Sequence, residues 1–287
     1  MMVTGHLKKF SRRYTQLLAA VVYNCNLSGF FTGKIYKGSS KNLCVPGLNC
    51  YSCPGAAFAC PLGSLQAAMF GSGYRMLSYV VGSLLLFGLL LGRVICGFLC
   101  PFGLIQELLD KIPLPKIKKS RVTRALSYVK YIILGLFVVV IPLTKALPGF
   151  CKYICPAGTL EAGIPLVMMD ERLQSQTGGL FSWKVFMLII CIILCSVCYR
   201  AFCRFICPLG AIYSFFNPIS FFGVRVDREK CTGCNACIRA CRMDVKRVSD
   251  HECIHCGACA GVCPENAITP AFCRGRKTAS DQLSEER

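Results

Sequence analysis

Four stretches of predominantly apolar residues, separated by polar segments, organise most of the chain. Each is about 20 residues long, the length that an α-helix needs to cross the hydrocarbon core of a bilayer. The stretches are residues 14–33, 76–95, 126–147 and 180–201. The pattern predicts an α-helical membrane domain with four transmembrane helices. Because no small-residue cleavage site follows the first stretch, we expect it to be an uncleaved anchor.

Positive charge is distributed unevenly between the segments that connect these stretches. Four Lys and Arg residues lie between positions 8 and 13, before the first stretch. The segment between the second and third stretches carries six more: Lys111, Lys116, Lys118, Lys119, Arg121 and Arg124. Because cytoplasmic loops of membrane proteins are enriched in Lys and Arg, we predict a multi-pass protein of the cell membrane with both termini in the cytoplasm. Residues 34–75 and 148–179 then form the outer loops.

Beyond residue 222 the chain becomes polar, and cysteines recur there in two runs with the spacing C-x2-C-x2-C-x3-C. The runs are Cys231, Cys234, Cys237 and Cys241, then Cys253, Cys256, Cys259 and Cys263. Three closely spaced cysteines can surround one [4Fe-4S] cluster, and the fourth reaches the other cluster. This crossed ligation assigns Cys231, Cys234, Cys237 and Cys263 to one cluster and Cys253, Cys256, Cys259 and Cys241 to the second. Zinc also accepts four thiolates, but zinc sites use paired C-x2-C motifs.

These patterns divide the chain into three predicted parts. Residues 1–222 form the transmembrane domain, and residues 223–272 form a small α+β domain that holds two [4Fe-4S] clusters. Residues 273–287 are a polar tail without a hydrophobic pattern, which predicts disorder. Residues 224–269 resemble the bacterial two-cluster ferredoxins over nearly their whole length. Arg242 stands where those ferredoxins usually have a proline, which removes no cluster ligand.

A second cysteine pattern is repeated at the predicted cytoplasmic ends of two spans. Cys96 and Cys100, and again Cys203 and Cys207, form the motif Cys-x3-Cys-Pro. Residues four apart share one face of a helix, and the proline ends the element. If the two helices are neighbours, the four thiols converge on one metal site. The alternative is that these cysteines pack as small hydrophobic side chains.

The predicted outer loops contain a related motif, in which Cys60-Pro61 matches Cys155-Pro156. The membrane domain therefore has two copies of a span, an outer cysteine motif, a span and an inner cysteine motif. Such a parallel repeat has a pseudo-twofold axis along the membrane normal and predicts cysteine motifs at both membrane faces. The candidate metal ligands of the outer face are Cys50, Cys53, Cys60, Cys151 and Cys155. Disulfides that involve these residues and Cys44 are an equal alternative in an oxidising compartment.

The remaining cysteines have no motif. Cys191, Cys195 and Cys198 lie within a predicted span and are expected to pack in the protein core, while Cys25 and Cys273 are expected to have no role.

Cys-x3-Cys-Pro motifs on helix ends, followed by a two-cluster ferredoxin module, resemble the NapH/NosR-type membrane polyferredoxins. The resemblance covers residues from about 14 to 269, although the chain has no flavin-binding domain of the kind that some relatives carry. It implies a membrane-bound iron–sulfur protein that relays electrons between a cytoplasmic or quinol donor and a partner oxidoreductase, including transfer across the membrane. The implied partners are a ferredoxin, a flavodoxin, a flavoprotein or a reductase subunit. One or two clusters in the membrane domain would add to the two in the ferredoxin module.

Other residue types narrow the function further. The three histidines, His6, His251 and His255, lie outside the spans, which excludes a membrane haem held by two histidines. No nucleotide-binding motif is visible, so we expect a non-catalytic electron-transfer subunit rather than an enzyme with its own substrate. The net charge is +19, but the basic residues adjoin apolar segments, which favours contact with membrane lipid over nucleic acid. The alternative function is an iron–sulfur redox sensor or assembly factor.

Overall fold

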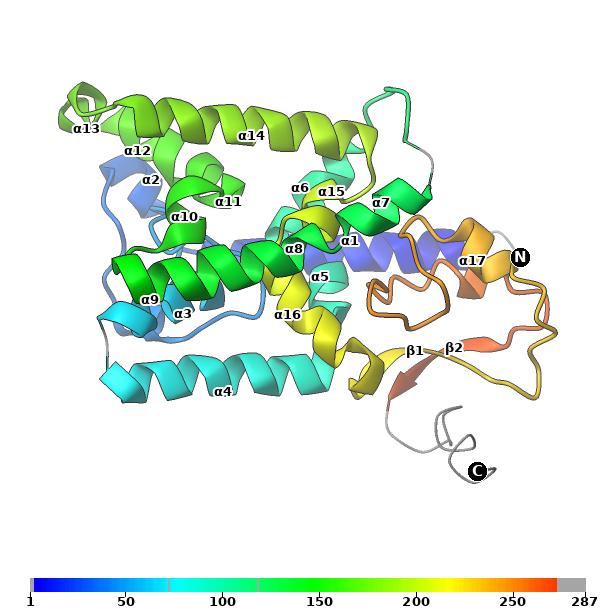
Figure 1. The fold of residues 1–287 in the computed structure, drawn as a ribbon. Coiled ribbons are helices and arrows are strands. Elements are labelled where there is room, and N and C mark those ends of the chain that lie inside the picture. The colour runs from blue at the N-terminus through cyan, green and yellow to red at the C-terminus, as the bar shows by residue number, and fades with distance from the viewer. Residues whose placement is uncertain (1–2, 72, 118, 273–287) are drawn as a thin grey trace.

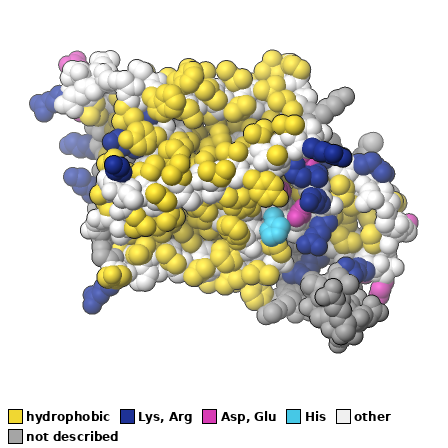
Figure 2. Space-filling model, viewed as in Figure 1, with side chains coloured by type: hydrophobic (Ala, Val, Ile, Leu, Met, Phe, Trp, Pro, Cys, Tyr) yellow, Lys and Arg dark blue, Asp and Glu magenta, His cyan; other side chains and the backbone are white. Residues whose placement is uncertain are grey.

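The computed structural model describes residues 3–71, 73–117 and 119–272, so the predicted tail 273–287 lies outside the described residues. Within these described residues, three helices are long and apolar enough to cross a membrane: Tyr74–Leu91, Arg121–Lys145 and Gly179–Val197. Only 17–22% of the residues in each are buried inside the protein. Figure 2 shows the exposed apolar side chains as a broad band, with Lys and Arg gathered at its two ends. This distribution fits an α-helical protein that associates with a membrane.

The predicted first span, residues 14–33, is not one continuous helix. Helix α1 (Val3–Tyr23) ends inside this stretch, and α2 (Ser28–Thr32) follows after a turn. The turn is held by Asn26, whose side-chain amide donates to the carbonyl oxygen of Pro54 at 2.9 Å. Asparagine favours such turns because its side chain can replace backbone hydrogen bonds.

The second candidate span, Arg121–Lys145, changes its helical pitch along its length. It consists of α7 (Arg121–Leu126), α8 (Val129–Ile133), the π-helical segment η2 (Leu134–Val140) and α9 (Ile141–Lys145). Pro142 lacks the N–H group that an α-helix needs at this point, and the π-helical turns precede it. The helix begins at Ser120, whose hydroxyl accepts from the backbone N–H of Thr123 at 3.2 Å.

The predicted internal repeat appears as two helical triplets of equal lengths. Helices α4 (Gly73–Leu91), α5 (Val94–Phe98) and α6 (Pro101–Leu109) contain 19, 5 and 9 residues. Helices α14 (Gly179–Val197), α15 (Ala201–Phe205) and α16 (Pro208–Phe216) contain 19, 5 and 9 residues as well. In both triplets a Cys-Pro step separates the second helix from the third.

Shorter elements fill the space between the long helices at the end of the molecule away from the ferredoxin module (Figure 1). They are η1 (Ser39–Asn42), α3 (Pro61–Phe70), α10 (Gly149–Tyr153), α11 (Pro156–Gly158), η3 (Thr159–Gly163), α12 (Ile164–Met169) and α13 (Glu171–Ser175).

Charged side chains are unusually prominent in the interior. Arg93, Arg200 and Lys130 are fully buried, and each forms an ion pair with a carboxylate. Glu107 pairs with Arg200 (2.6 Å) and with Arg12 (2.8 Å). Arg93 and Lys130 both pair with Glu252, which belongs to the ferredoxin module. Because a buried charge without a partner is costly, the two ion pairs of Glu252 fix the module against the membrane helices.

The ferredoxin module follows η4 (Asn217–Ile219) and is closed by a two-stranded antiparallel sheet. Strand β1 (Phe222–Val226) pairs with β2 (Ile268–Phe272) in a register that places Val224 opposite Pro270. Between the strands lie α17 (Ala236–Ala240) and η5 (Ala260–Val262). The sheet brings the two ends of the module together, so both cysteine runs lie in the loops that it closes.

Candidate metal centres formed by cysteines

The structure brings together the four cysteines of the two Cys-x3-Cys-Pro motifs. We call Cys96, Cys100, Cys203 and Cys207 the Cys100 group; all four are buried. Burial raises the pKa of the Cys100 thiol to about 12, and the charges of Cys203 and Cys96 add to the shift. The pKa of Cys207 is raised in the same way by burial and then by the other three thiols.

A second set of four thiols converges between α3, α10 and α11. We call Cys50, Cys60, Cys151 and Cys155 the Cys60 group. Burial raises the pKa of the Cys151 thiol to about 12, and the charges of Cys60 and Cys50 raise it further. Burial also raises the pKa of the Cys155 thiol, and the charges of Cys151 and Cys60 raise it further.

Cys53 is a predicted ligand that we do not place in the Cys60 group. Its thiol accepts hydrogen bonds from the backbone N–H groups of Gly55 and Ala56, and its charged neighbours are Glu161 and Lys41. Cys50 is the member of this loop that reaches the other thiols, since a Cβ atom on Gly158 would lie 3.7 Å from its sulfur.

The sequence Cys-Pro-x-Gly explains how each helix presents a thiol. Cys60, Cys100, Cys155 and Cys207 occupy the position before the first helical residue of α3, α6, α11 and α16. The following proline suits the first helical position because the N–H group is not needed there. The glycine N–H at the third helical position then points back to the sulfur, at 3.4 Å for Gly158 and Gly210. Free N–H groups at a helix start favour a thiolate.

Two buried glutamines connect the halves of the repeat, and the sequence analysis did not identify them. Gln66 donates to the sulfur of Cys151 at 3.3 Å, and Gln106 donates to the sulfur of Cys203 at 3.0 Å. Each lies six residues after a Cys-Pro cysteine of the first half and reaches a cysteine of the second. The equal spacing after Cys60 and Cys100 is the sequence feature that could have identified both glutamines.

Two arginines form a reciprocal clamp around the Cys100 group. Arg93 donates to the carbonyl oxygen of Cys203 at 3.2 Å, and Arg200 donates to that of Cys96 at 2.5 Å. Each precedes the first cysteine of its own motif by three residues and reaches the first cysteine of the other motif. The clamp places two permanent positive charges beside four thiols.

The crossed arrangement predicted for the ferredoxin module is reflected in the positions of its thiols. Cys231, Cys234, Cys237 and Cys263, the Cys231 group, line one cavity of about 150 Å³. Cys241, Cys253, Cys256 and Cys259 form the Cys241 group. Burial raises the pKa of Cys259 to about 12, and the charges of Cys253, Cys256 and Cys241 add to the shift.

The Cys60 and Cys100 groups are close neighbours, and their predicted location at opposite membrane faces stays a prediction. Two consecutive residues lie between them: the N–H of Leu48 donates to the sulfur of Cys100, and that of Asn49 donates to the sulfur of Cys60. Segment 44–60 enters the interior instead of forming a surface loop. Sequence patterns could not show this, because loop entry depends on buried hydrogen bonds made far along the chain.

The Cys100 group also adjoins the ferredoxin module. A Cβ atom on Gly97, between Cys96 and Cys100, would lie 2.4 Å from the carbonyl oxygen of Ile254, between Cys253 and Cys256. Only glycine permits this close approach. The four groups therefore follow one another from the Cys60 group through the Cys100 and Cys241 groups to the Cys231 group, from α3 and α10 towards α17 in Figure 1.

The chemistry of these sites fits iron–sulfur clusters. A cluster binds thiolates, and a [4Fe-4S] cluster with four thiolates carries about two negative charges. The buried arginines and the N–H groups directed at sulfur compensate such charge around the Cys100 group. At the Cys60 group, the Asn49 side-chain amide is fully buried and has no hydrogen-bond partner among the described residues. A bound cluster, whose sulfur atoms accept hydrogen bonds, would give this buried amide a partner.

His255 lies between the sheet and the Cys241 group. Burial is the main reason why its pKa is lowered to about 4, with contributions from Arg93 and Arg225. Its Nδ1 accepts from the N–H of Val224 at 2.9 Å, which leaves Nε2 to donate to Asn217 at 3.0 Å. His255 is thus a neutral packing residue, whereas His251 is exposed.

The other cysteines lie outside the four groups. Cys191, Cys195 and Cys198 are buried in or after α14, where core packing was predicted, and Cys44 is buried and receives a hydrogen bond from Ser64. Cys25 is exposed. All the cysteines in the described part of the chain are free thiols, and no three potential ligands there are close enough to hold a single metal ion. Cys273 lies outside the described residues.

Comparisons with known proteins agree with the cysteine arrangement. A family model described as a 4Fe-4S binding domain matches residues 72–120, 128–164 and 180–225. A second model with the same description matches residues 224–247 and 246–269. No solved structure shows a significant match to the chain.

Several curated proteins are similar to the chain. An uncharacterized protein of Methanocaldococcus jannaschii is 30% identical over 197 residues, which are 64% of this chain and 74% of the relative. The methylamine utilization ferredoxin-type protein MauN of Paracoccus denitrificans is 30% identical over 173 residues, 56% of this chain and 53% of the relative. The ferredoxin-type protein NapH of Escherichia coli is 24% identical over 190 residues, 62% of this chain and 61% of the relative.

The chain therefore binds [4Fe-4S] clusters and has an electron-transfer role. Its repeated Cys-x3-Cys-Pro motifs, its ferredoxin module and these relatives show that it belongs to the NapH/NosR-type membrane polyferredoxins.

Proposed function

We propose that the protein is a membrane-embedded electron relay with four [4Fe-4S] clusters, one held by each group of four cysteines. The observation that carries this proposal is the uninterrupted order of the groups. Leu48 and Asn49 link the Cys60 and Cys100 groups, and Gly97 touches the loop of the Cys241 group. Electron tunnelling falls steeply with distance, so a relay requires neighbouring centres of this kind.

The proposed direction of the relay is perpendicular to the membrane. The Cys231 group would lie at the cytoplasmic end, together with both chain termini, and the Cys60 group would lie towards the outer face. The basic segment 111–124 at the cytoplasmic end supports this orientation. Helix α1 would lie against the other spans as an additional membrane segment. A partner oxidoreductase would accept or supply electrons near the Cys60 group, and a ferredoxin, flavodoxin, flavoprotein or quinol would serve the other end.

The cluster number gives the first test. We expect about 16 iron atoms and about 16 acid-labile sulfides per chain after anaerobic purification, since each [4Fe-4S] cluster contributes four of each. Replacing Cys60, Cys151 and Cys155 by serine should lower the iron content to about 12 and abolish electron delivery to an acceptor outside sealed vesicles.

Cys53→Ser provides the matched control, because Cys53 is equally buried in the same region but lies outside the Cys60 group. It should keep the full iron content. About eight irons in the unmodified protein, or unchanged iron and electron transfer in the triple variant, would contradict the relay.

Asn49 offers a more local test of cluster binding at the Cys60 group. We expect Asn49→Leu to lower the reduction potential of one cluster by roughly 20–60 mV, the equivalent of losing one hydrogen bond of about 0.5–1.5 kcal/mol. Hydrogen bonds to cluster sulfur stabilise the reduced, more negative state. The measurement is an EPR-monitored redox titration of the full chain. Asn42→Leu serves as the control, because Asn42 is an exposed residue at the end of η1 and lies outside the four cysteine groups. Unchanged reduction potentials in Asn49→Leu would show that this amide does not donate a hydrogen bond to a cluster.

A further inference from the structure

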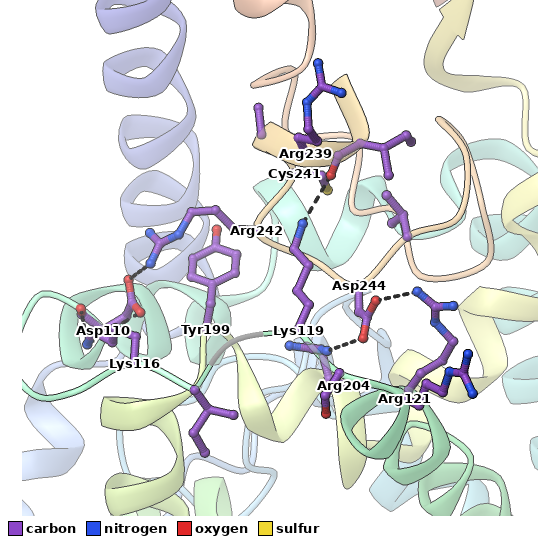
Figure 3. Close-up of a pocket in the computed structure, with 16 residues that line it drawn as sticks. Asp110, Lys116, Lys119, Arg121, Tyr199, Arg204, Arg239, Cys241, Arg242 and Asp244 are labelled. Carbon is purple, nitrogen blue, oxygen red and sulfur yellow. Dashed lines mark hydrogen bonds and ion pairs between the residues drawn. The ribbon is translucent and has the colours of Figure 1, made fainter. Parts of the chain in front are cut away.

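A basic cleft lies between the ferredoxin module and the connection from α6 to α7 (Figure 3). Its volume is about 790 Å³. Seven of its lining side chains are Lys or Arg and two are Asp, so positive charge is in clear excess. The basic ones are Lys116, Lys119, Arg121, Arg124, Arg204, Arg239 and Arg242.

The acidic residues of the cleft neutralise only part of this charge. Arg242 donates to Asp110 at 2.5 Å, and Arg124 donates to Asp244 at 2.9 Å. Three exposed cations, Lys119, Arg121 and Arg239, have no carboxylate partner in the part of the chain that the structure describes. Lys119 donates only to the carbonyl oxygen of Ile238, at 3.1 Å. These side chains are free to meet negative charge from another molecule.

The wall of the cleft also contains Cys241, a member of the Cys241 group. Arg239 and Arg242 flank this cysteine in the sequence, and Figure 3 shows the Lys119 side chain reaching from the α6–α7 connection towards Arg239 and Cys241 on the module. An anionic surface seated here would come directly beside a cluster ligand. Membrane topology alone explains basic residues in segment 111–124, but it does not explain Arg239 and Arg242 around a cluster ligand of the soluble module.

We propose that this cleft docks an acidic electron-carrier protein, which exchanges single electrons with the cluster held by the Cys241 group. The inference rests on the proposed relay and adds the entry point. One electron leaves the reduced carrier and reduces one [4Fe-4S] cluster from the 2+ to the 1+ state, with no bond made or broken. Electrons then enter beside the Cys100 group instead of at the distal Cys231 group. Opposite charges on the two surfaces accelerate their encounter.

The test compares two double variants of the full cluster-loaded chain in nanodiscs of zwitterionic lipid. Arg121→Gln with Arg239→Gln removes two unpaired cations from the cleft. Lys246→Gln with Arg247→Gln removes the same charge from exposed residues that line the cavity of the Cys231 group. The probe is a chemically reduced, acidic plant-type [2Fe-2S] ferredoxin, and cluster reduction is followed by stopped-flow absorbance. Binding of the oxidised probe is measured separately by thermophoresis.

At low ionic strength we expect the cleft variant to react about tenfold more slowly with the ferredoxin and to bind it correspondingly more weakly. The difference should disappear in about 1 M salt, where charges are screened within about 3 Å. Reduction by methyl viologen radical, a small cation, should not fall in either variant.

Other outcomes overturn the proposal in distinguishable ways. A larger loss in the Lys246/Arg247 variant would place entry at the Cys231 group, and equal rates in all proteins would exclude docking at the cleft. An effect of the cleft variant that appears only in discs with anionic lipid would identify the cleft as a headgroup site. Failure of viologen to reduce any cluster reversibly would instead contradict the proposed relay itself.

Discussion

Replacing Cys100 and Cys207 together by serine is expected to stop electron passage between the ferredoxin module and the Cys60 group. These residues belong to the group that lies between the Cys60 and Cys241 groups, so their loss removes the centre between them and leaves a gap across which tunnelling is slow. Iron should fall from about 16 to about 12 atoms per chain. The ferredoxin clusters should keep their EPR signals and should still be reduced from the cytoplasmic side. Transfer to an impermeant acceptor outside sealed vesicles should fall to background.

Cys191→Ser with Cys195→Ser is the matched control for this variant. It also replaces two thiols that are buried beside the Cys100 group, and Cys195 even donates to Gln106 at 3.6 Å. Both residues lie outside the four groups, so iron and electron transfer should be retained. If the Cys100/Cys207 variant kept its iron, or lost iron yet still passed electrons outward, the Cys100 group would not be a member of the relay.

Cysteine spacing predicted much of the candidate site because ligand spacing is local. In the two C-x2-C-x2-C-x3-C runs and in both Cys-x3-Cys-Pro motifs the ligands are only a few residues apart, so the local backbone places them. The helices of the Cys-x3-Cys-Pro motifs end at the Cys-Pro steps, as expected. Cys50 was harder to separate from Cys53, since neither stands in a repeated motif. Only the folded path of segment 44–60 directs Cys50 towards Cys155 and leaves Cys53 among backbone N–H groups.

The membrane arrangement was predicted less completely for a related reason. Hydropathy identifies helices that face lipid, and three of the four predicted stretches are such helices. It does not distinguish a lipid-facing helix from a segment that turns into the protein, as happens at Asn24 to Leu27. The buried ion pairs of Arg93 with Glu252 and of Arg200 with Glu107 were also invisible, because their partners lie 159 and 93 positions away in the sequence.

Gly97 lies at the contact between the Cys100 and Cys241 groups, and Gly97→Ala is expected to slow electron exchange between them by about tenfold. The added Cβ atom would lie 2.4 Å from the carbonyl oxygen of Ile254, a backbone atom that cannot rotate away. Relieving the overlap costs about 1–3 kcal/mol and moves the Ile254 loop away from α5, which lengthens the tunnelling path between the two clusters and so slows the transfer. Helix propensity has the opposite sign, since alanine stabilises a helix by about 1 kcal/mol relative to glycine. The measurement is the rate of outward electron delivery after rapid reduction of the ferredoxin clusters.

Gly261→Ala tests whether the effect comes from this contact. Gly261 also lies between two cluster ligands, Cys259 and Cys263, but a Cβ atom there would meet nothing within 4 Å. It should leave the rate unchanged, and both variants should retain the full iron content. Equal rates in Gly97→Ala and the unmodified protein would mean that electrons do not cross at the Gly97–Ile254 contact. A slow rate with lost iron would instead assign the effect to cluster assembly, so iron and rate have to be measured on the same preparation.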